Sequence, residues 1–398
     1  MTLRPLSRRA ALALAGAAAL VLAGGALRFV DALGRPLPGG DAFAPWTLWR
    51  DPALAGTPTA LVAAAILAAN PHNAQPWLFR RPGDDAIEVC ANFSRRLAAM
   101  DPYARELHFG LGCAIENMNS AAGPNGFDVA IDVASGALAA PAESSAPALA
   151  ARIELTRRPL GAPDPLYDAI PLRRTNRYAY RRDASLPADW LALARAGAPD
   201  DGVRVLLFAE GEARRAFDAA VVEATQAFVA DAPMIGESDR WLRSSAREIE
   251  AHRDGPTLDT AGLSFLALAY AKLFPVSAET SHRAWIDQTR RVQLASAPLV
   301  GLIAVRDRYD RRGAIAAGRL WQRLHLAATG FGVALQPINQ PIEMIDRERF
   351  LDRGDAWARR IEALAGSGWQ ATFAFRAGLP TRAAPASPRR RLADVLAG

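Results

Sequence analysis

The sequence is almost without lysine. Lys272 is the only one among 47 basic residues, so nearly all of the positive charge is carried by arginine, and the formal net charge is +6. The arginines occur in short, scattered clusters. Long basic tracts, or stripes of basic and aromatic residues, are typical of nucleic-acid-binding proteins and are missing here. We favour a GC-rich coding bias as the explanation of this composition, and we do not expect nucleic acid as a partner.

Cysteine is equally scarce, since the chain contains only Cys90 and Cys113. Their spacing fits neither a metal site nor a redox Cys-x-x-Cys pair. The sequence leaves open whether they form a disulfide or are two small buried residues, and the second alternative is favoured. The five histidines are isolated from one another and from carboxylates at ligand spacings, so no metal site is predicted.

The common catalytic motifs are missing as well. We find no Gly-x-Ser-x-Gly, no P-loop, no His-Glu-x-x-His and no Gly-x-Gly-x-x-Gly that opens a helix. No side chains form a recognisable nucleophile–base pair, and we therefore assign no catalytic residue.

The longest uncharged run is short for a membrane span. It extends over 18 residues from Ala10 to Leu27, is rich in alanine and glycine, and follows Ser7-Arg8-Arg9. A spanning helix needs about 20 strongly apolar residues, whereas a charged start, a mildly apolar run and small residues are typical of a secretory signal. The segment Ser-Arg-Arg-Ala-Ala-Leu resembles a twin-arginine signal with alanine in place of phenylalanine.

We therefore interpret residues 1–40 as a targeting segment. The protein is expected to leave the cytoplasm by the twin-arginine export machinery and to be periplasmic. The alternative is an uncleaved N-terminal anchor that keeps it attached to the membrane. Twin-arginine export carries folded proteins, and this suits a protein that acquires a cofactor before it crosses the membrane.

Helical and strand patterns alternate along the rest of the chain, which indicates an α+β fold. Apolar residues at helical spacing predict a helix from Ala104 to Ala122, and alternating residues predict a strand from Phe127 to Val133. Residues 134–150 are expected to form a loop that enters a helix. The other predicted helices are 59–70, 187–196, 212–230 and 318–330, and the other predicted strands are 86–91, 203–208, 299–305, 333–336 and 371–376.

A shift of 206 positions aligns two windows of the chain. Gly112–Gly126 overlays Gly318–Gly332, with glycine at both ends, an Ala-Ala pair in common, and a strand following each window. The same order of glycine, helix, glycine corner and strand thus occurs twice. We predict two related halves that form a pseudo-dimer in one chain, a first half at 55–160 and a second half at 161–398. The second half includes a possible lid at 232–262.

One cluster of polar residues is Arg173-Arg174-Thr175-Asn176-Arg177. In an extended backbone, Arg173, Thr175 and Arg177 would point to the same side. Two guanidinium groups around a hydroxyl suit a phosphate or a flat anionic heterocycle. The alternative is a solvated basic loop. A second basic cluster, Arg389-Arg390-Arg391, follows the last predicted strand, and the apolar residues after it suggest that the tail packs against the fold.

The segment Asn-Pro-His-Asn-Ala-Gln-Pro-Trp (70–77) concentrates amides at a corner between a predicted helix and a strand. Asn73 and Gln75 offer donors and acceptors that can read the edge of a heterocycle, Pro76 fixes the turn, and Trp77 can anchor the strand. Amides, arginines and a hydroxyl without an acid–base pair form the set of groups that is expected where a bound cofactor performs the chemistry.

Together these motifs resemble the nitroreductase-like flavoproteins, most closely the long single-chain branch known as Acg-family FMN-binding oxidoreductases. Asn73-Ala74-Gln75-Pro76-Trp77 matches the end of a family segment at the flavin, although Ala69-Asn70 replaces its Pro-Ser start. The arginine motif at 173–177 matches the family's Arg-Arg-Ser-x-Arg. Gly378-Leu379-Pro380, the tail arginines with Leu392, and Leu335–Glu343 resemble its C-terminal pattern and the stretch beside the flavin ring.

This resemblance implies a nitroreductase-like fold, FMN as the cofactor, NAD(P)H as the hydride donor and a small aromatic, nitro or quinone acceptor. The implied cofactor-binding residues are Asn70, Asn73, Gln75, Arg173, Arg174, Thr175, Asn176, Arg177, Gln336, Pro337, Arg389 and Arg390. It also implies one complete site, shared by the two halves of a monomer, because an arginine motif of the first half would fall before residue 1.

Two alternatives stay open. The protein could bind or store flavin without turnover, with residues 232–262 folded over the pocket, since nicotinamide donors are scarce outside the cytoplasm. It could also be a membrane-attached scaffold without a ligand.

Overall fold

The computed structural model describes residues 40–397, apart from 142–145, 163 and 198–201. The predicted targeting segment therefore lies, except for Gly40, outside the described residues. Within the described part, no helix is both long enough and apolar enough to cross a bilayer.

The first half forms a sheet with the strand order β3-β4-β2-β1-β9. The strands of this half pair antiparallel and are β1 (Trp77–Arg80), β2 (Ala86–Ala91), β3 (Phe127–Val133) and β4 (Ala148–Arg157). The outer strand β9 (Leu396–Ala397) comes from the C-terminus and pairs parallel to β1. The tail of the second half thus completes the sheet of the first.

The second half forms a sheet with the order β5-β6-β8-β7, again antiparallel throughout. Its strands are β5 (Val203–Phe208), β6 (Leu299–Val305), β7 (Ala334–Pro337) and β8 (Gln370–Gly378). Without β9 and starting from the opposite edge, the first sheet has the order β1-β2-β4-β3. The second sheet, β5-β6-β8-β7, repeats this order, so that β1, β2, β3 and β4 correspond to β5, β6, β7 and β8. A long helix separates the second and third strand of each set. The predicted α+β class and the two related halves are therefore confirmed.

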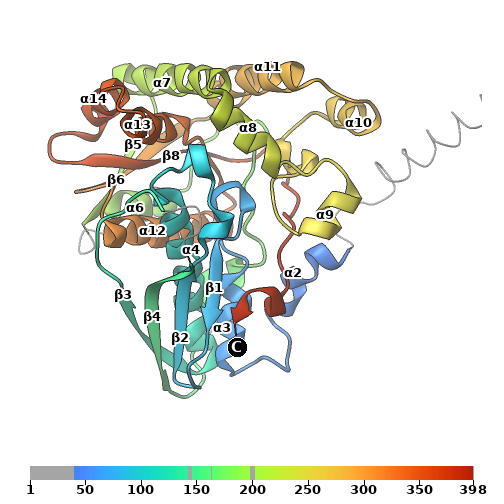
Figure 1. Ribbon diagram of the computed structural model, residues 1–398, viewed down its shortest axis with the longest axis vertical. Helices are drawn as coiled ribbons and strands as arrows, with labels where there is room; N and C mark the ends of the chain where they lie inside the picture. Colours follow the sequence, from blue (N-terminus) through green and yellow to red (C-terminus); the bar gives the residue numbers. More distant parts are fainter. Residues whose placement is uncertain (1–39, 142–145, 163, 198–201, 398) are drawn as a thin grey trace, which may run out of the picture.

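The two sheets lie on either side of the long helices α4 (Arg105–Ala122) and α12 (Arg311–Gly330) (Figure 1). The outer side of the second sheet is covered by α7 (Gly211–Ala230), α13 (Gln340–Phe350) and α14 (Ala356–Ala365). The remaining α-helices are α2 (Pro45–Leu48), α3 (Pro58–Ala65), α5 (Pro165–Ala169), α6 (Ala188–Ala196), α8 (Ala232–Trp241), α9 (Ala246–His252), α10 (Phe265–Leu273) and α11 (Ala278–Gln288).

Helices α4 and α12 approach each other closely at Gly112 and Gly318, the two glycines that the 206-residue shift superimposes. A Cβ on Gly112 would lie 2.1 Å from the Ile315 carbonyl oxygen, and a Cβ on Gly318 would lie 1.9 Å from that of Phe109. Ile315 and Phe109 are themselves 206 positions apart. The contact is therefore the same on both sides, as a local two-fold axis between the helices requires.

The equivalence begins earlier in the chain than we predicted. Asp-x-Tyr-x-Arg occurs at 101–105 and again at 307–311, before each central helix. The two tyrosines, Tyr103 and Tyr309, meet edge to face with ring centroids 5.0 Å apart. The repeat thus places like residues against each other across the axis.

Polar residues extend this contact toward the ends of the two helices. Glu116 pairs with Arg319 and Arg323, and Gln322 donates to Asn117 at 2.7 Å. A large cluster of buried hydrophobic residues includes Phe127 and Ile153 of the first sheet and Ile303 of the second. The two halves therefore share one hydrophobic core.

Strand β4 corrects one prediction, because residues 134–150 do not lead into a helix. The alanine-rich composition favoured a helix, but β4 pairs with β2 on one side and with β3 on the other. These strand contacts bury small residues such as Ala150 and Ala151 and determine the conformation. Helix α12 also begins at Arg311, seven residues before the predicted start, after an Asp310 cap. Cys90 and Cys113 are both buried and free, so they form no disulfide.

We expect Gly318→Ala to destabilise the protein by roughly 1–3 kcal/mol, because its Cβ would overlap the Phe109 backbone and force the central helices apart. Gly330→Ala is a matched control in α12, since a Cβ there would meet no atom within 4 Å. Urea unfolding of both variants measures the difference. Equal stability of the two would show that close helix contact is not required.

Candidate functional site

The segment at 70–76 forms a tight corner between α3 and β1. The side-chain oxygen of Asn70 accepts a hydrogen bond from the backbone amide of Gln75 at 2.7 Å. His72, Asn73 and Gln75 all have positive φ angles, of 46°, 51° and 53°. This left-handed conformation is unfavourable for residues other than glycine, so strong contacts elsewhere must hold the corner in place.

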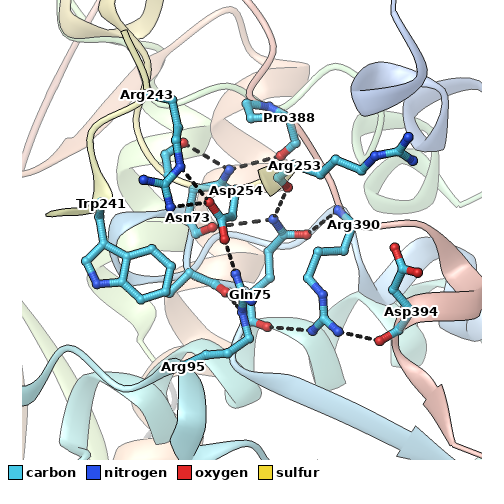
Figure 2. A network of polar contacts seen from close by, with 12 residues as sticks. Asn73, Gln75, Arg95, Trp241, Arg243, Arg253, Asp254, Pro388, Arg390 and Asp394 are labelled. Atoms are coloured by element: carbon cyan, nitrogen blue, oxygen red, sulfur yellow. Dashed lines mark hydrogen bonds and ion pairs between the residues drawn. The ribbon is translucent and has the colours of Figure 1, made fainter. Parts of the chain in front are cut away.

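Two distant segments supply those contacts (Figure 2). The Asn73 amide donates to the carbonyl oxygens of Pro388, at 2.9 Å, and Gly255, at 3.2 Å. Gln75 donates to the Arg253 carbonyl at 2.8 Å and accepts from the Arg390 backbone amide at 2.7 Å. Both N–H bonds of the Asn73 amide are thus used within the protein. The predicted roles of Asn73 and Gln75 in reading a flavin ring remain predictions.

Asp254 holds one of these two segments, residues 253–255, in place. Its carboxylate is buried and pairs with Arg243, at 2.7 Å, and with Arg95, which also donates to the Ala74 carbonyl (Figure 2). Trp241 lies against Arg95, with the guanidinium carbon 5.4 Å from its ring centroid. The predicted lid, residues 232–262, therefore lies against the corner. Sequence reasoning missed Arg95 and Asp254, which stand 159 positions apart and share no motif.

Three arginines from the predicted motifs form a cluster in which Arg173 and Arg389 are buried and Arg174 is half-buried. Arg173 and Arg389 both donate to the Leu67 carbonyl, at 3.3 and 3.4 Å, beyond the C-terminal end of α3. The guanidinium carbons of Arg174 and Arg389 lie 3.9 and 4.8 Å from the centroid of the same Trp46 ring. Arg389 also donates to the side-chain oxygen of Asn73. The cluster thus joins the 173–177 motif, the tail and the corner.

The charges of this cluster are not neutralised by the protein. Among the described residues, no carboxylate forms an ion pair with Arg173, Arg174 or Arg389. Also within this part of the chain, Nε and Nη1 of Arg173 and Nε of Arg389 are buried donors that lack a hydrogen-bond partner. Buried unpaired donors are costly, so the cluster is suited to an anion that would satisfy them.

The pKa values of these three arginines also indicate that their positive charge is not compensated. Burial lowers the pKa of Arg173 to about 10, and burial together with Arg173 lowers that of Arg174 to about 9. Burial and both neighbouring arginines hold the pKa of Arg389 well below its usual range. Each shift reflects a cation without a counter-charge. A bound phosphate group would reverse these shifts, because guanidinium groups bind phosphate oxygens in bidentate fashion.

The N-terminal arm covers this cluster. It consists of a 3-10 turn, Asp41–Phe43, followed by α2. The Trp46 indole donates to the Ser387 carbonyl at 2.8 Å, and the Arg389 amide donates to the Ala42 carbonyl at 2.7 Å. Trp46 was not predicted as a site residue. Its signal, a tryptophan near two prolines, does not distinguish it from the eight other tryptophans.

The residues of the 173–177 motif do not share one face, contrary to the alternation expected for an extended backbone. The Arg173 amide bonds to the Ala169 carbonyl, so the chain is still turning there, and Arg173 and Arg174 reach the same cluster. Arg177 instead donates to the Thr260 carbonyl at 3.1 Å. It lies near His72, whose pKa falls to about 4 through burial and this positive charge.

Four further predicted residues lie in β7 or beside it. Thr175 bridges to Leu335 in parallel, and Asn176 donates to the Arg382 carbonyl at 2.8 Å. Gln336 accepts from Arg376 at 2.6 Å, and Pro337 ends the strand. Asn176 and Gln336 are therefore bonded to protein groups around the buried Arg376, apart from the three-arginine cluster. Their predicted flavin contacts remain predictions.

A second buried charge cluster lies at the start of α4. Arg105 pairs with Asp346 at 2.8 Å and with Glu106 at 3.3 Å, and Asp101 and Glu343 complete the group. Burial, opposed by Arg105 and reinforced by the other carboxylates, raises the pKa of Glu106 to about 7 and that of Asp101 to about 6. Burial and these neighbours raise the pKa of Glu343 well above its ordinary value. One arginine cannot neutralise four carboxylates, so the group retains protons near neutral pH.

Comparisons with known proteins give matches among solved structures alone. No family model matches the sequence, and no curated protein matches it. Nitroreductase NfnB of Mycobacterium smegmatis, solved in complex with NADPH, is similar over 59% of this chain and 97% of its own, with 18% identity and a TM-score of 0.37. The FMN- and NADPH-dependent NfnB of a Sphigopyxis strain covers 58% and 98%, with 17% identity and a TM-score of 0.36.

A nitroreductase with bound FMN from Bacteroides fragilis is similar over 57% of this chain and 95% of its own, with 14% identity and a TM-score of 0.32. At these identities and TM-scores, similarity alone assigns neither a ligand nor an activity to this chain. The residues of the site must carry the functional assignment.

We expect inorganic phosphate to stabilise the flavin-free protein through the arginine cluster, because a ligand that binds only the folded state raises its stability. Arg173→Met should abolish most of the phosphate-dependent rise in Tm, whereas Arg195→Met, at an exposed position on α6, should leave it intact. Chloride at matched ionic strength controls for screening. An equal phosphate effect in both variants would contradict an anion site at Arg173.

We expect Glu106→Gln to stabilise the protein more at about pH 8 than at about pH 5. Because the folded-state pKa is raised, the folded protein binds more protons than the unfolded chain, and wild-type stability falls as the pH rises through that range. Between about pH 5 and about pH 8 the stability of the variant relative to the wild type should rise by about 1–3 kcal/mol. Chemical unfolding at both pH values measures it, with the exposed Glu279→Gln as control; a gain independent of pH would refute a raised pKa.

Proposed function

We propose that this protein is an FMN-dependent oxidoreductase of the nitroreductase type. The observation that carries the proposal is the cluster of Arg173, Arg174 and Arg389. This cluster brings together the motifs at 70–77 and 173–177 and the C-terminal tail, all of which the family resemblance places at a flavin. Its buried guanidinium groups include hydrogen-bond donors that lack a partner. The similarity to an FMN-bound and an FMN-dependent nitroreductase agrees with this proposal but does not carry it.

The residues present fit the phosphate end of FMN. Arg173, Arg174 and Arg389 would hold the phosphate, and Trp46 would keep the planes of two of these guanidinium groups in position. Arg177, Gln336 and Pro337 are proposed to lie along the flavin ring, as the family resemblance implies. The phosphate would neutralise the arginine charges, whose burial is unfavourable without an anion. The relief of this unfavourable burial would contribute to the binding free energy of the cofactor.

The chemistry that FMN would supply when bound is the transfer of reducing equivalents from NAD(P)H to a small aromatic, nitro or quinone acceptor. The chain's own residues then need no nucleophile or general base, in agreement with the lack of such a pair in the sequence. Their tasks are to bind the phosphate, to favour negative charge on the ring through the arginines, and to limit access of water. The N-terminal arm and residues 253–255 cover the site from two sides.

One site is proposed for each chain. The corner before β1 belongs to the first half, and the 173–177 motif belongs to the second. The protein would thus work as a monomeric pseudo-dimer with a single FMN.

Export is part of the proposal. Residues 1–40 would direct the folded, FMN-loaded protein through the twin-arginine route to the periplasm or would attach it to the membrane. The arm that begins at Gly40 is bonded to the C-terminal tail through Ala42 and Trp46, so the cofactor would be enclosed by residues next to the signal.

A second candidate function is flavin binding without turnover. It is favoured by Asp254, whose two arginine partners hold residues 253–255 firmly on the corner. A pocket that stays closed would bind flavin but would exclude the nicotinamide. Anaerobic mixing with NADPH separates the two functions: rapid bleaching of the flavin spectrum supports the enzyme, and bleaching by dithionite alone supports storage.

We expect Arg173→Met to weaken FMN binding by about tenfold to a hundredfold, because a charge-assisted hydrogen bond to phosphate contributes roughly 1.5–3 kcal/mol. Quenching of flavin fluorescence during titration of the flavin-free protein measures the Kd. Arg195→Met should bind FMN like the wild type. Unchanged affinity in Arg173→Met, with the fold intact by circular dichroism, would reject the proposed phosphate site.

A further inference from the structure

Helix α10 is the most exposed apolar segment of the described chain. None of its nine residues is buried. Phe265, Leu266 and Tyr270 are 62%, 78% and 58% exposed, and Phe274, directly after the helix, is 54% exposed. Four of the eleven exposed large hydrophobic residues of the described chain therefore lie within ten positions. A concentration of this kind is typical of an interaction surface.

The segment is also nearly free of charge. Between Gly262 and Val276, Lys272 is the only charged residue, and its ammonium group pairs with Asp259 at 2.7 Å. The Ser264 side chain caps the start of the helix by accepting a hydrogen bond from the Ala267 backbone amide. Its apolar residues consequently project from an ordered helix that the rest of the fold leaves uncovered.

The start of the described chain lies on the same side of the molecule. A Cβ on Gly40 would fall 1.7 Å from the Glu250 carboxylate of α9, and the Ala42 amide donates to that carboxylate at 3.1 Å. The short 3-10 turn Leu258–Ala261 connects the region of α9 with α10, and Figure 1 shows both helices on one side. The 39 preceding residues, with the uncharged run from Ala10 to Leu27, thus join the fold close to α10.

We propose that α10 and Phe274 form a membrane-binding surface that rests in the headgroup region of a bilayer. Phenylalanine, leucine and tyrosine are the residues that favour this interface. The net charge of +6 adds attraction to anionic lipids. A single short apolar helix binds membranes weakly, and an adjacent second attachment, the N-terminal segment, converts weak contact into stable binding. The proposal does not depend on the bound cofactor.

A fluorescent label on α10 of the full-length chain tests this surface directly. The environment-sensitive dye NBD is attached at Leu266→Cys, and Leu160→Cys, 74% exposed in the first half, is the matched control. Cys90 and Cys113 are buried, so labelling is directed to the introduced thiol. Vesicles of phosphatidylglycerol and phosphatidylethanolamine should shift the emission at position 266 to the blue and shield the dye from iodide, with no change at position 160.

The double change Phe265→Ser with Leu266→Ser should also weaken binding to these vesicles by about tenfold, because two large apolar side chains no longer leave water. Both residues are exposed, so the fold should be unaffected. The proposal is overturned if the vesicles sediment the protein while the label at position 266 stays in water, since the N-terminal segment alone would then bind. A blue shift that depends on protein concentration without vesicles would instead identify a second copy of the chain as the partner and would likewise overturn it.

Discussion

The site depends on one constraint: three guanidinium groups, two of them buried and one half-buried, lie together without a counter-ion. Arg173, Arg174 and Arg389 come from two segments more than 200 positions apart, and they meet at the carbonyl of Leu67 and the ring of Trp46. Bringing like charges together in a buried place is unfavourable unless an anion joins them. The strained corner at 72–75, the tail and the N-terminal arm all hold this arrangement. The arginine cluster and its anion would therefore stabilise each other.

The duplicated architecture explains how one chain can build such a site. Helices α4 and α12 meet around a local two-fold axis at Gly112 and Gly318, and β9 crosses from the second half to the sheet of the first. This crossing carries Arg389 and Arg390 to the corner at Asn73 and Gln75. Two equivalent halves would by symmetry produce two sites, but the corner and the arginine motif each occur in one half. A single site in each chain, shared by the two halves, is therefore what we propose.

Much of the fold could be predicted from the sequence because local patterns determined it. The strands Phe127–Val133 and Leu299–Val305 have the predicted bounds, and the shift of 206 positions identified both glycines of the central contact. Prediction failed where tertiary contacts outweighed composition, as in β4, whose alanines are buried between paired strands. It also failed for Trp46 and Asp254, because a stacked ring or a buried counter-ion has no local signature. The motifs found Arg173 and Arg389, but their meeting at one carbonyl is a property of the fold.

The most direct test of a single site shared by the two halves is the stoichiometry of bound flavin. The protein is saturated with FMN, freed of excess cofactor and denatured, and the released flavin is measured by absorbance against the concentration of chain. We predict one FMN per chain. Two per chain would show that each half keeps its own site, and none would show that the arginine cluster does not bind this cofactor.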